Sequence, residues 1–383
     1  KIRSYHPYPA LDEIKVEQAA ALINQAKKPL LLVGQGVILS DAQQELVAFV
    51  ERTGIPVAST LLGLSAVATD HPLYVGYLGM HGNYGPNVKT NECDLLIAVG
   101  MRFDDRVTGD LNTYAKQAKV IHIEIDPSEI NKNVVADIGI NADAKEALIS
   151  LMGKVDKNTH DKWLAEFHAC TKIEHDKIRA GEMHPTEGGL KMAEIVTMLS
   201  EKTDGKAVVV TDVGQHQMVT SRYYQFKDKR QNVTSGGLGT MGFALPAAMG
   251  AGLGQKDRPV IAIIGDGGFQ MTIQELGTIF QSQIPVKILI LNNNFLGMVR
   301  QWQELFFEGR YSFTELVNPD FVKVAEGFRI EAFKVEEREN LEASIDRFLA
   351  AEGPILLEAV VEKEENVFPM IPTGASVSDI RLE

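Results

Sequence analysis

The sequence predicts an α/β protein with two doubly wound parallel-sheet domains, and three observations support this prediction. Short apolar runs such as LLLVG at 30–34 and DLLIAVG at 94–100 are typical of strands buried on both faces. Stretches with helical spacing of apolar residues lie between these runs, as in a parallel sheet covered by helices. The chain has 383 residues, whereas one domain usually has roughly 100–200.

The first domain is expected at residues 1–155. A helix is predicted over about 14–28, and Pro29 opens the first strand. Ser40-Asp41 has the composition of a helix N-cap, which predicts that a second helix begins there. The further strands of this domain are expected at IPVAS (55–59), DLLIAVG (94–100) and KVIHIEID (119–126).

A polar stretch at 156–185 is interpreted as a partly helical linker. The alternation of apolar runs and helices resumes after it, which places a second domain at 186–383. The strands of this domain are expected at AVVVTD (207–212), PVIAIIGD (259–266), PVKILILN (285–292), IEAFKV (330–335) and PILLEAVV (354–361).

Composition excludes several classes of protein. The net charge is −13 and no dense Lys/Arg cluster occurs, which argues against a nucleic-acid partner. The uncharged stretches at 54–69 and 235–254 are interrupted by Gly and Pro, so neither is expected to cross a membrane. Cys93 and Cys170 show no metal-ligand spacing and fit a reducing compartment, so we expect a cytoplasmic protein.

The sharpest local signal is Gly265-Asp266-Gly267, which lies between an apolar strand and the helical stretch FQMTIQELGTIF. Asn292, Asn293 and Asn294 end the next strand. Successive strands of a parallel sheet end on the same edge, so Asp266 and one of these Asn residues can meet at one metal ion. Mg²⁺ prefers such oxygen ligands. GDG alone is also a common turn, but its spacing from the Asn run favours a metal site.

GDG followed some two dozen residues later by NN resembles the signature of thiamine diphosphate enzymes. Longer stretches resemble the catalytic subunit of acetohydroxyacid synthase, over nearly the whole chain. These stretches are GYLGMHGNYGPN (76–87), GMRFDDRVTG (100–109), SGGLGTMGFALPAA (235–248) and LNNNFLGMVRQWQ (291–303).

The resemblance implies a central FAD-binding-like domain at 1–155 and a thiamine diphosphate-binding C-terminal domain at 186–383. The family also has an N-terminal domain that binds the pyrimidine of the cofactor and supplies a Glu. Neither has a counterpart in this sequence. We therefore expect the chain to be part of a longer protein and to be inactive by itself.

The resemblance further implies which residues hold thiamine diphosphate and Mg²⁺. The metal ligands would be Asp266, Asn293 and the backbone carbonyl of Phe295, where many relatives have another residue. The groups implied for the diphosphate are the amides of Gly267 and Gly268 and the side chains of Gln215 and His216. His216 taken alone could equally be a structural histidine.

Met241 is implied as the wedge that bends the cofactor, and the carbonyl of Gly239 as the partner of its amino group. Met298 and Trp302 lie about one helical turn apart and are implied in the active-site pocket, with Trp302 favouring 2-oxobutanoate as acceptor. Each of these three large side chains could instead belong to the apolar core.

Arg106 is a candidate to bind the carboxylate of the acceptor, because a guanidinium binds it bidentately. A salt bridge from Arg106 to Asp104 or Asp105 is the alternative. Met80 and His81 are implied at the same entrance. The positions implied for FAD are Gly36 in the VGQG turn (33–36), Thr60, Leu61, Asp105, Glu124 (where relatives often have Asp), Ile125, Asp143 and Ala144.

The implied reaction is decarboxylation of pyruvate and transfer of the two-carbon unit to pyruvate or 2-oxobutanoate, in valine, leucine and isoleucine biosynthesis. Flavin has no redox step in it. The implied partners are small 2-oxo acids, a second or further copies in a homodimer or homotetramer, and a regulatory subunit. The alternatives are a pyruvate oxidase, a catabolic acetolactate synthase, or a nucleotide-binding module without turnover.

Overall fold

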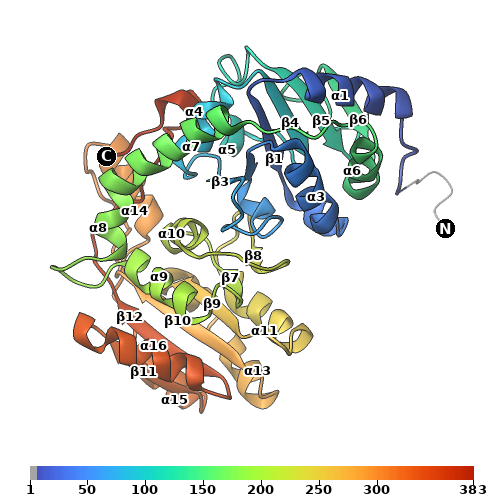
Figure 1. Cartoon of the computed structure of the whole chain (residues 1–383). Helices are drawn as coiled ribbons and strands as arrows, with labels where there is room; N and C mark the ends of the chain where they lie inside the picture. Colours follow the sequence, from blue (N-terminus) through green and yellow to red (C-terminus); the bar gives the residue numbers. More distant parts are fainter. Residues whose placement is uncertain (1–6) are drawn as a thin grey trace. The chain divides into compact units, whose positions relative to one another are not determined.

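The computed structural model describes residues 7–383, which form two compact units (Figure 1). Unit 1 comprises the described residues up to Ile178 together with Phe368–Glu383, and unit 2 comprises Arg179–Val367. Each unit contains one six-stranded parallel sheet flanked by helices. The predicted fold class is therefore confirmed.

The sheet of unit 1 has the strand order β3-β2-β1-β4-β5-β6. Its strands are β1 (Pro29–Val33), β2 (Val57–Ser59), β3 (Tyr74–Tyr77), β4 (Leu95–Val99), β5 (Lys119–Glu124) and β6 (Ile138–Asn141). The chain winds from β1 to one side and then resumes with β4 on the other. Such a switch point opens a crevice at the carboxyl ends of the two strands, where ligands bind in this class of fold.

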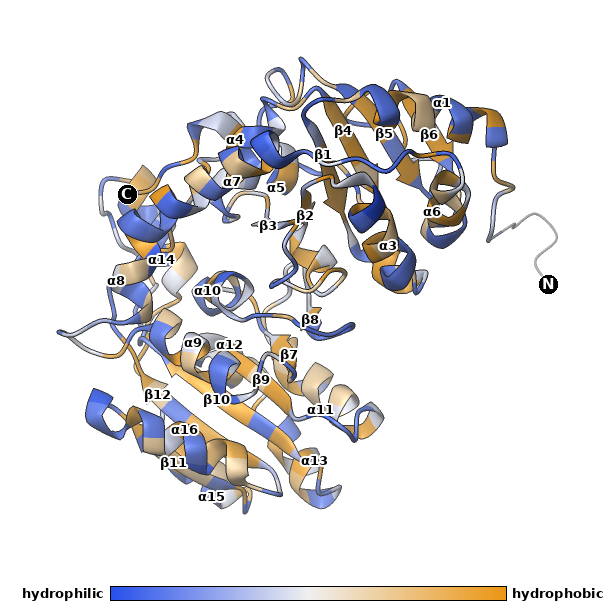
Figure 2. Ribbon diagram, in the orientation of Figure 1, coloured by the Kyte–Doolittle hydropathy of each residue, from blue (hydrophilic) through white to orange (hydrophobic). Residues whose placement is uncertain are grey.

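Both faces of this sheet are covered. The helices are α1 (Glu13–Gln25), α2 (Gln35–Leu39), α3 (Gln43–Thr53), α4 (Tyr84–Thr90), α5 (Asp105–Thr108), α6 (Ala144–Met152) and α7 (Asp161–Glu174), with short turns η1 (Leu61–Gly63), η2 (His175–Arg179) and η4 (Val377–Asp379). Leu31 and Val33 pack in one apolar core with α1, α3 and α6, whereas Leu30 and Leu32 pack in a second core with α7. Alternate residues of a strand point to opposite faces, and Figure 2 shows the central strands β1 and β4 in the colours of hydrophobic residues.

Three features of unit 1 differ from the expectation. The predicted cap at Ser40-Asp41 is wrong, because α2 occupies the preceding residues, Asp41 has φ 53° and α3 begins at Gln43 without a side-chain cap. Part of the expected linker is α7, whose Trp163 is buried and donates to the Pro29 carbonyl at 2.9 Å. Residues 368–383, expected in the second domain, pack in unit 1, where Asp110 N–H donates to the Ala375 carbonyl.

The sheet of unit 2 has the order β11-β12-β10-β9-β7-β8. Its strands are β7 (Val208–Thr211), β8 (Asn232–Thr234), β9 (Val260–Gly265), β10 (Val286–Asn292), β11 (Glu331–Val335) and β12 (Ile355–Val360). Here the switch point lies between β7 and β9. Chain topology alone therefore predicts a ligand crevice at the carboxyl ends of these two strands.

Helices cover both faces of this sheet as well. They are α8 (Ala180–Met183), α9 (Met192–Lys202), α10 (Gln215–Tyr223), α11 (Ala244–Gly254), α12 (Asp266–Met271), α13 (Glu275–Gln281), α14 (Gly297–Phe306), α15 (Phe321–Gly327) and α16 (Leu341–Ala350), with the turn η3 (Arg338–Asn340). Val260, Ala262 and Ile264 pack with α11, α13 and α15. On the other face, α10 lies against β7 and β9, and α16 lies against β12.

The helical stretch expected after Gly267 is two helices, because α12 ends at Met271 and α13 begins at Glu275. Within residues 7–383, no helix combines the length and the apolar composition that crossing a membrane requires.

Candidate functional site

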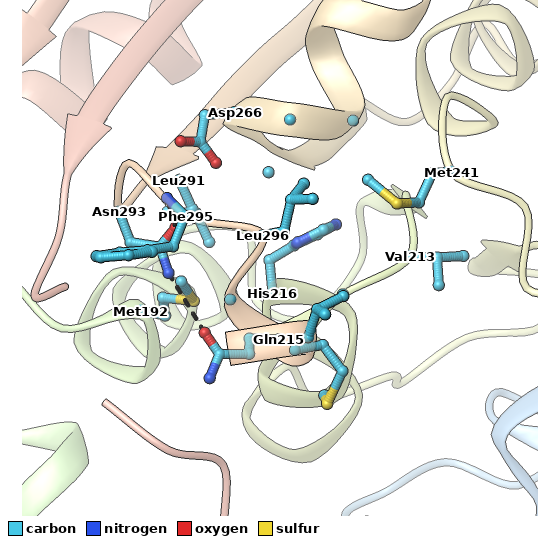
Figure 3. Close-up of a pocket in the computed structure, with 17 residues that line it drawn as sticks. Met192, Val213, Gln215, His216, Met241, Asp266, Leu291, Asn293, Phe295 and Leu296 are labelled. Atoms are coloured by element: carbon cyan, nitrogen blue, oxygen red, sulfur yellow. Dashed lines mark hydrogen bonds between the residues drawn. The ribbon is translucent and has the colours of Figure 1, made fainter. Parts of the chain in front are cut away.

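A pocket lies at the switch point of unit 2, at the carboxyl ends of β7, β9 and β10 (Figure 3). Nine of its lining residues are predicted site residues, namely Gln215, His216, Met241, Asp266, Gly267, Gly268, Asn293, Phe295 and Met298. They come from four separate stretches of the chain. The sheet brings these stretches to one edge, as the motif spacing predicted.

Asp266 is the first residue of α12 and is only 1% exposed. Its Oδ2 accepts a 2.7 Å hydrogen bond from Asn318 Nδ2, and it makes no ion pair with any described residue. Burial raises the pKa of this carboxyl to about 6, although hydrogen bonds from Asn318 and from backbone amides act in the opposite direction. A buried carboxylate without a positive partner is the kind of group that a bound cation stabilises.

Asn293 follows β10 and is also buried. Its Nδ2 donates to Gln215 Oε1 at 3.3 Å, and its Oδ1 accepts from the Phe295 amide at 3.1 Å. Residues around Phe295 form a short antiparallel bridge with Glu315, which holds this loop over the edge of the sheet. The carboxamide oxygen of Asn293 therefore has a fixed direction.

Gly268 permits a close approach between α12 and the end of β7. A Cβ at Gly268 would lie 1.8 Å from Asp212 Oδ2, and a Cβ at Gly267 would lie 2.7 Å from Leu296 Cδ2. Asp212 is fully buried, and its carboxylate accepts from the amides of Gly242, Phe243 and Ala244 at the start of α11. Packing thus requires glycine at 268 whether or not its amide also faces a ligand.

His216 contributes an unpartnered polar atom to the pocket. Its Nε2 is buried without a hydrogen-bond partner among the described residues. The ring lies beside Gly214 and Gly265, where an added Cβ would come within 3.0 Å of it. Burial lowers the pKa of His216 to about 4, and Asp212 acts in the opposite direction. An anion in the pocket would give this nitrogen a partner.

Gln215 lines the pocket, but both polar atoms of its side chain already have protein partners. Its Nε2 donates to Gln301 Oε1 at 3.0 Å and to the Glu365 carbonyl at 2.8 Å, while its Oε1 accepts from Asn293. A direct side-chain contact of Gln215 with a diphosphate would have to break one of these bonds.

Of four further predicted residues of unit 2, two line this pocket and two do not. Met241 and Met298 line it. Gly239 does not, but its φ of 64° and the open space around its Cα leave its backbone accessible. Trp302 is half-buried on α14 and packs against Phe306, with ring centroids 4.9 Å apart, so it is not a residue of the closed core.

In unit 1, Arg106 is exposed on α5, next to Met80, and forms no salt bridge with any residue that the structure describes. Arg102 pairs with Asp104 instead, at 3.5 Å. The expected alternative of an Arg106 salt bridge is therefore wrong. The Met80 amide donates to the Arg106 carbonyl at 2.8 Å, and the next residue in the sequence, His81, is buried.

The residues predicted for FAD lie at or after the carboxyl ends of β1, β2, β4, β5 and β6 in the first sheet. Gly36 packs on Gly100, at 2.6 Å from an ideal Cβ to the Gly100 Cα, which closes the gap between the β1 and β4 ends. Three of the others accept hydrogen bonds from nearby backbone amides. Thr60 accepts from Gly63, Glu124 from Ile125 and Asp126, and Asp143 from the first turn of α6. Ala144 is the first residue of α6. Leu61 begins η1, Ile125 is exposed after β5, and Asp105 is exposed as the first residue of α5.

Comparisons with known proteins agree with this geometry. The family model described as the central domain of thiamine pyrophosphate enzymes matches residues 16–151, and that of their C-terminal, thiamine pyrophosphate-binding domain matches residues 212–359. The chain belongs to the thiamine pyrophosphate enzymes. Thiamine pyrophosphate is another name for thiamine diphosphate, so the predicted family is confirmed.

Several curated members of this family are similar over nearly the whole chain. The acetolactate synthase isozyme 2 large subunit of Escherichia coli is 43% identical over 96% of this chain and 66% of its own length. Acetolactate synthase 2 of Nicotiana tabacum chloroplasts is 43% identical over 97% and 57%, and the large subunit of Corynebacterium glutamicum is 42% identical over 98% and 61%. The chain therefore spans about three fifths of the length of these relatives.

The donor set of this thiamine pyrophosphate enzyme fits a hard cation beside a diphosphate. It offers a buried carboxylate, a directed carboxamide oxygen and an orphaned imidazole nitrogen around one pocket. No group of three His, Cys, Asp or Glu side chains that could hold a metal occurs in residues 7–383. Mg²⁺ takes few protein carboxylates and keeps phosphate and water oxygens.

Sequence reasoning missed Asn318, Gln301 and Asp212. Asn318 lies in the loop before α15, and its Nδ2 is within 3.1 Å of oxygens of Asp266, Asn292 and Asn294. No local motif marks Asn318, and Gln301 lies within LNNNFLGMVRQWQ (291–303) but nothing in that stretch shows that its side chain reaches Gln215. Asp212 could have been found, since it ends a predicted strand at the same edge as Asp266.

Proposed function

We propose that the chain acts in an acetolactate synthase, which decarboxylates pyruvate and transfers the two-carbon unit to pyruvate or 2-oxobutanoate. The observation that carries this proposal is the pocket that joins Asp266, Asn293 and His216 at the β7/β9 switch point. The similarity to acetolactate synthase large subunits supports this reaction over the others of the family.

In this proposal Mg²⁺ is held by Asp266, by Asn293 Oδ1 and by the carbonyl of Phe295. A carbonyl ligand does not depend on the side chain, so Phe295 is compatible with this role. The diphosphate would complete the metal shell, facing the amides of Gly267 and Gly268 and the imidazole of His216. Gln215 would support the site through Asn293, since its own amide is engaged.

Thiamine diphosphate, when bound, supplies the electron sink for decarboxylation. Met241 and Met298 would pack against it, and the carbonyl of Gly239 would accept from its amino group. Their positions along the pocket and the accessible backbone at Gly239 support these roles. The protein's contribution is then to orient the cofactor and to exclude water.

For the acceptor 2-oxo acid, we propose that Arg106 binds the carboxylate, with Met80 and His81 next to it. Its guanidinium is exposed and makes no salt bridge with residues 7–383, which supports this role. Trp302 would contact the extra methyl group of 2-oxobutanoate, which its half-buried position allows.

For unit 1 we propose FAD as a bound, non-redox cofactor along the carboxyl edge of the sheet. The β1/β4 switch point and the acidic residue Glu124 at the end of β5 support a dinucleotide there. Assembly as a homodimer or homotetramer with a regulatory subunit is proposed from the relatives, whose names call them large subunits.

The experiment that tests the proposed function combines binding and product formation. Thiamine diphosphate binding to the chain is measured by calorimetry with and without Mg²⁺, and acetolactate formation from pyruvate is measured in the complete enzyme with FAD present. Mg²⁺-dependent binding and acetolactate formation, both lost in Asp266→Asn, are expected. Formation of acetate or hydrogen peroxide in place of acetolactate would support a pyruvate oxidase and contradict the proposal.

A further inference from the structure

Three buried side-chain amides form a row that ends in the pocket of unit 2. Gln301 on α14 is 0% exposed, Gln215 at the start of α10 is 4% exposed, and Asn293 after β10 is 4% exposed. Each amide is hydrogen-bonded to the next, Gln301 to Gln215 at 3.0 Å and Gln215 to Asn293 at 3.3 Å. We call this row the amide relay.

The backbone of Val367 fixes the direction of the relay at its outer end. The Val367 N–H donates to Gln301 Oε1 at 2.8 Å, and Gln301 Nε2 donates to the Val367 carbonyl at 3.2 Å. A backbone N–H can only donate and a carbonyl can only accept. The Gln301 amide therefore has one favourable orientation, with its oxygen toward Gln215.

The orientation of the Gln301 amide determines that of Gln215 and, through it, that of Asn293. Facing the oxygen of Gln301, Gln215 must present its nitrogen, and the same nitrogen also donates to the Glu365 carbonyl at 2.8 Å. The oxygen of Gln215 then faces Asn293, which must present its own nitrogen. Gly297 leaves room for this contact, since a Cβ there would lie 2.1 Å from Gln215 Oε1 and 2.8 Å from Asn293 Nδ2.

The consequence is that Asn293 Oδ1 points away from Gln215, where it accepts from the Phe295 amide at 3.1 Å. An Asn side chain whose amide turned over would present a nitrogen there, and an amide NH₂ does not bind a hard cation. Reversing the relay at Gln301 would favour that wrong orientation.

We infer that Gln301 is a positioning residue, which acts through Gln215 to present the oxygen of Asn293 to a divalent cation. This inference rests on the proposed function of Asn293 as a metal ligand. Residues that orient a metal ligand typically change metal affinity about 10–100-fold when they are replaced.

The test uses Mn²⁺ in place of Mg²⁺, because free Mn²⁺ can be counted by electron paramagnetic resonance. The chain is titrated with Mn²⁺ in the presence of thiamine diphosphate. Gln301→Met, which keeps length and burial, is expected to weaken Mn²⁺ binding about 10–100-fold. If this variant does not fold, as judged by circular dichroism, Gln301→Leu is used with the same expectation.

Gln303→Met is the matched control on the same helix. The amide of Gln303 also clamps a backbone segment, donating to the Ser312 carbonyl at 3.1 Å and accepting from the Ser312 amide at 2.9 Å. These hydrogen bonds of Gln303 do not lead to Asn293. An equal loss of Mn²⁺ affinity in Gln303→Met would show that loosening α14 is sufficient and would overturn the inference.

A second comparison, made in the Asn293→Asp variant, distinguishes an effect on amide orientation from general damage to the fold. In Asn293→Asp both terminal atoms are oxygens, so a carboxylate is presented in either orientation. Adding Gln301→Met to Asn293→Asp is expected to leave Mn²⁺ affinity unchanged, since the carboxylate presents an oxygen to the cation in either orientation. The same 10–100-fold loss in both backgrounds would overturn the inference. Failure of the unaltered chain to bind Mn²⁺ at all would instead contradict the proposed function.

Discussion

Asn318 donates a 2.7 Å hydrogen bond to Asp266 across 52 residues of sequence. The same amide nitrogen lies 3.0 Å from Asn292 Oδ1 and 3.1 Å from Asn294 Oδ1. An amide has two N–H groups, so it cannot satisfy all three oxygens at once. Since Asn292 Oδ1 also accepts from the Asn294 amide at 3.0 Å, the Asn318 amide joins Asp266 to the Asn run at the edge of the sheet.

The first prediction concerns the stability of the metal-free chain. The folded-state pKa of Asp266 is raised by burial from 3.8 to about 6, so the folded chain binds more protons than the unfolded chain between these values. Asp266 therefore lowers stability as pH rises from about 4 to 6, and the full loss is present above 6. Asp266→Asn should stabilise the chain at pH 8 by as much as about 3 kcal/mol, and little at pH 4.

Urea unfolding at pH 8 and at pH 4 measures this difference. A less stable Asp266→Asn chain at pH 8 would show that the carboxylate is satisfied without a metal ion.

The second prediction concerns His216, whose pKa burial lowers from 6.5 to about 4. The unfolded chain then binds more protons than the folded chain in this range, so His216 reduces stability as pH falls from about 6.5 to 4. This slope is opposite to that of Asp266. His216→Gln should make stability fall more steeply with rising pH across this window, and Asp266→Asn should do the reverse.

Denaturant midpoints of the His216→Gln and Asp266→Asn variants, measured at several pH values from 4 to 7, test these two opposite slopes. Parallel profiles for both variants and the unaltered chain would contradict the assignment of these two pKa shifts.

The third prediction concerns the glycine of the α12 turn. Gly268→Ala forces a Cβ against Asp212 Oδ2, at 1.8 Å in the present geometry, and should cost about 1–3 kcal/mol of stability. Gly250→Ala is the control, because Gly250 is exposed on α11 with nothing within 4 Å of its added Cβ. It should be neutral or stabilise by about 0.5–1 kcal/mol. Thermal unfolding of both variants tests whether close packing against Asp212 is the reason for glycine at position 268.

The fourth prediction concerns the choice of acceptor in the complete enzyme. If Trp302 packs against the extra methyl group of 2-oxobutanoate, Trp302→Leu should lower the preference for it over pyruvate by about 10–200-fold at most. Competition between the two acceptors, with both products quantified, measures the ratio. An unchanged product ratio would show that Trp302 serves only to pack against Phe306.

Much of the fold could be predicted from the sequence because its strands are buried on both faces. Leu30–Val33 and Val286–Leu291 are uninterrupted or nearly uninterrupted apolar runs, and both are strands. The short edge strands β3, β6 and β8 were missed because their residues are only partly buried, so they lack such a run. The cap at Ser40-Asp41 failed because tertiary contacts place a short helix before it.

The candidate site, like the fold, was only partly predictable from the sequence. Asp266 and Asn293 could be placed together from sequence because both follow neighbouring parallel strands. Gln301 and Asn318 could not, because a helix face and a long loop bring them to the site only in the folded chain. The relay from Val367 also depends on backbone atoms, on which the sequence pattern carries no signal.

We propose that Asp266 and Asn293 hold the metal ion through which thiamine diphosphate binds. The most direct measurement is a calorimetric titration of the chain with thiamine diphosphate, with Mg²⁺ present and with Mg²⁺ removed by chelation, repeated for Asp266→Ala. We expect binding only with Mg²⁺ and a sharp loss of affinity in the variant. Equal affinity with and without Mg²⁺, or an unchanged affinity in Asp266→Ala, would contradict it.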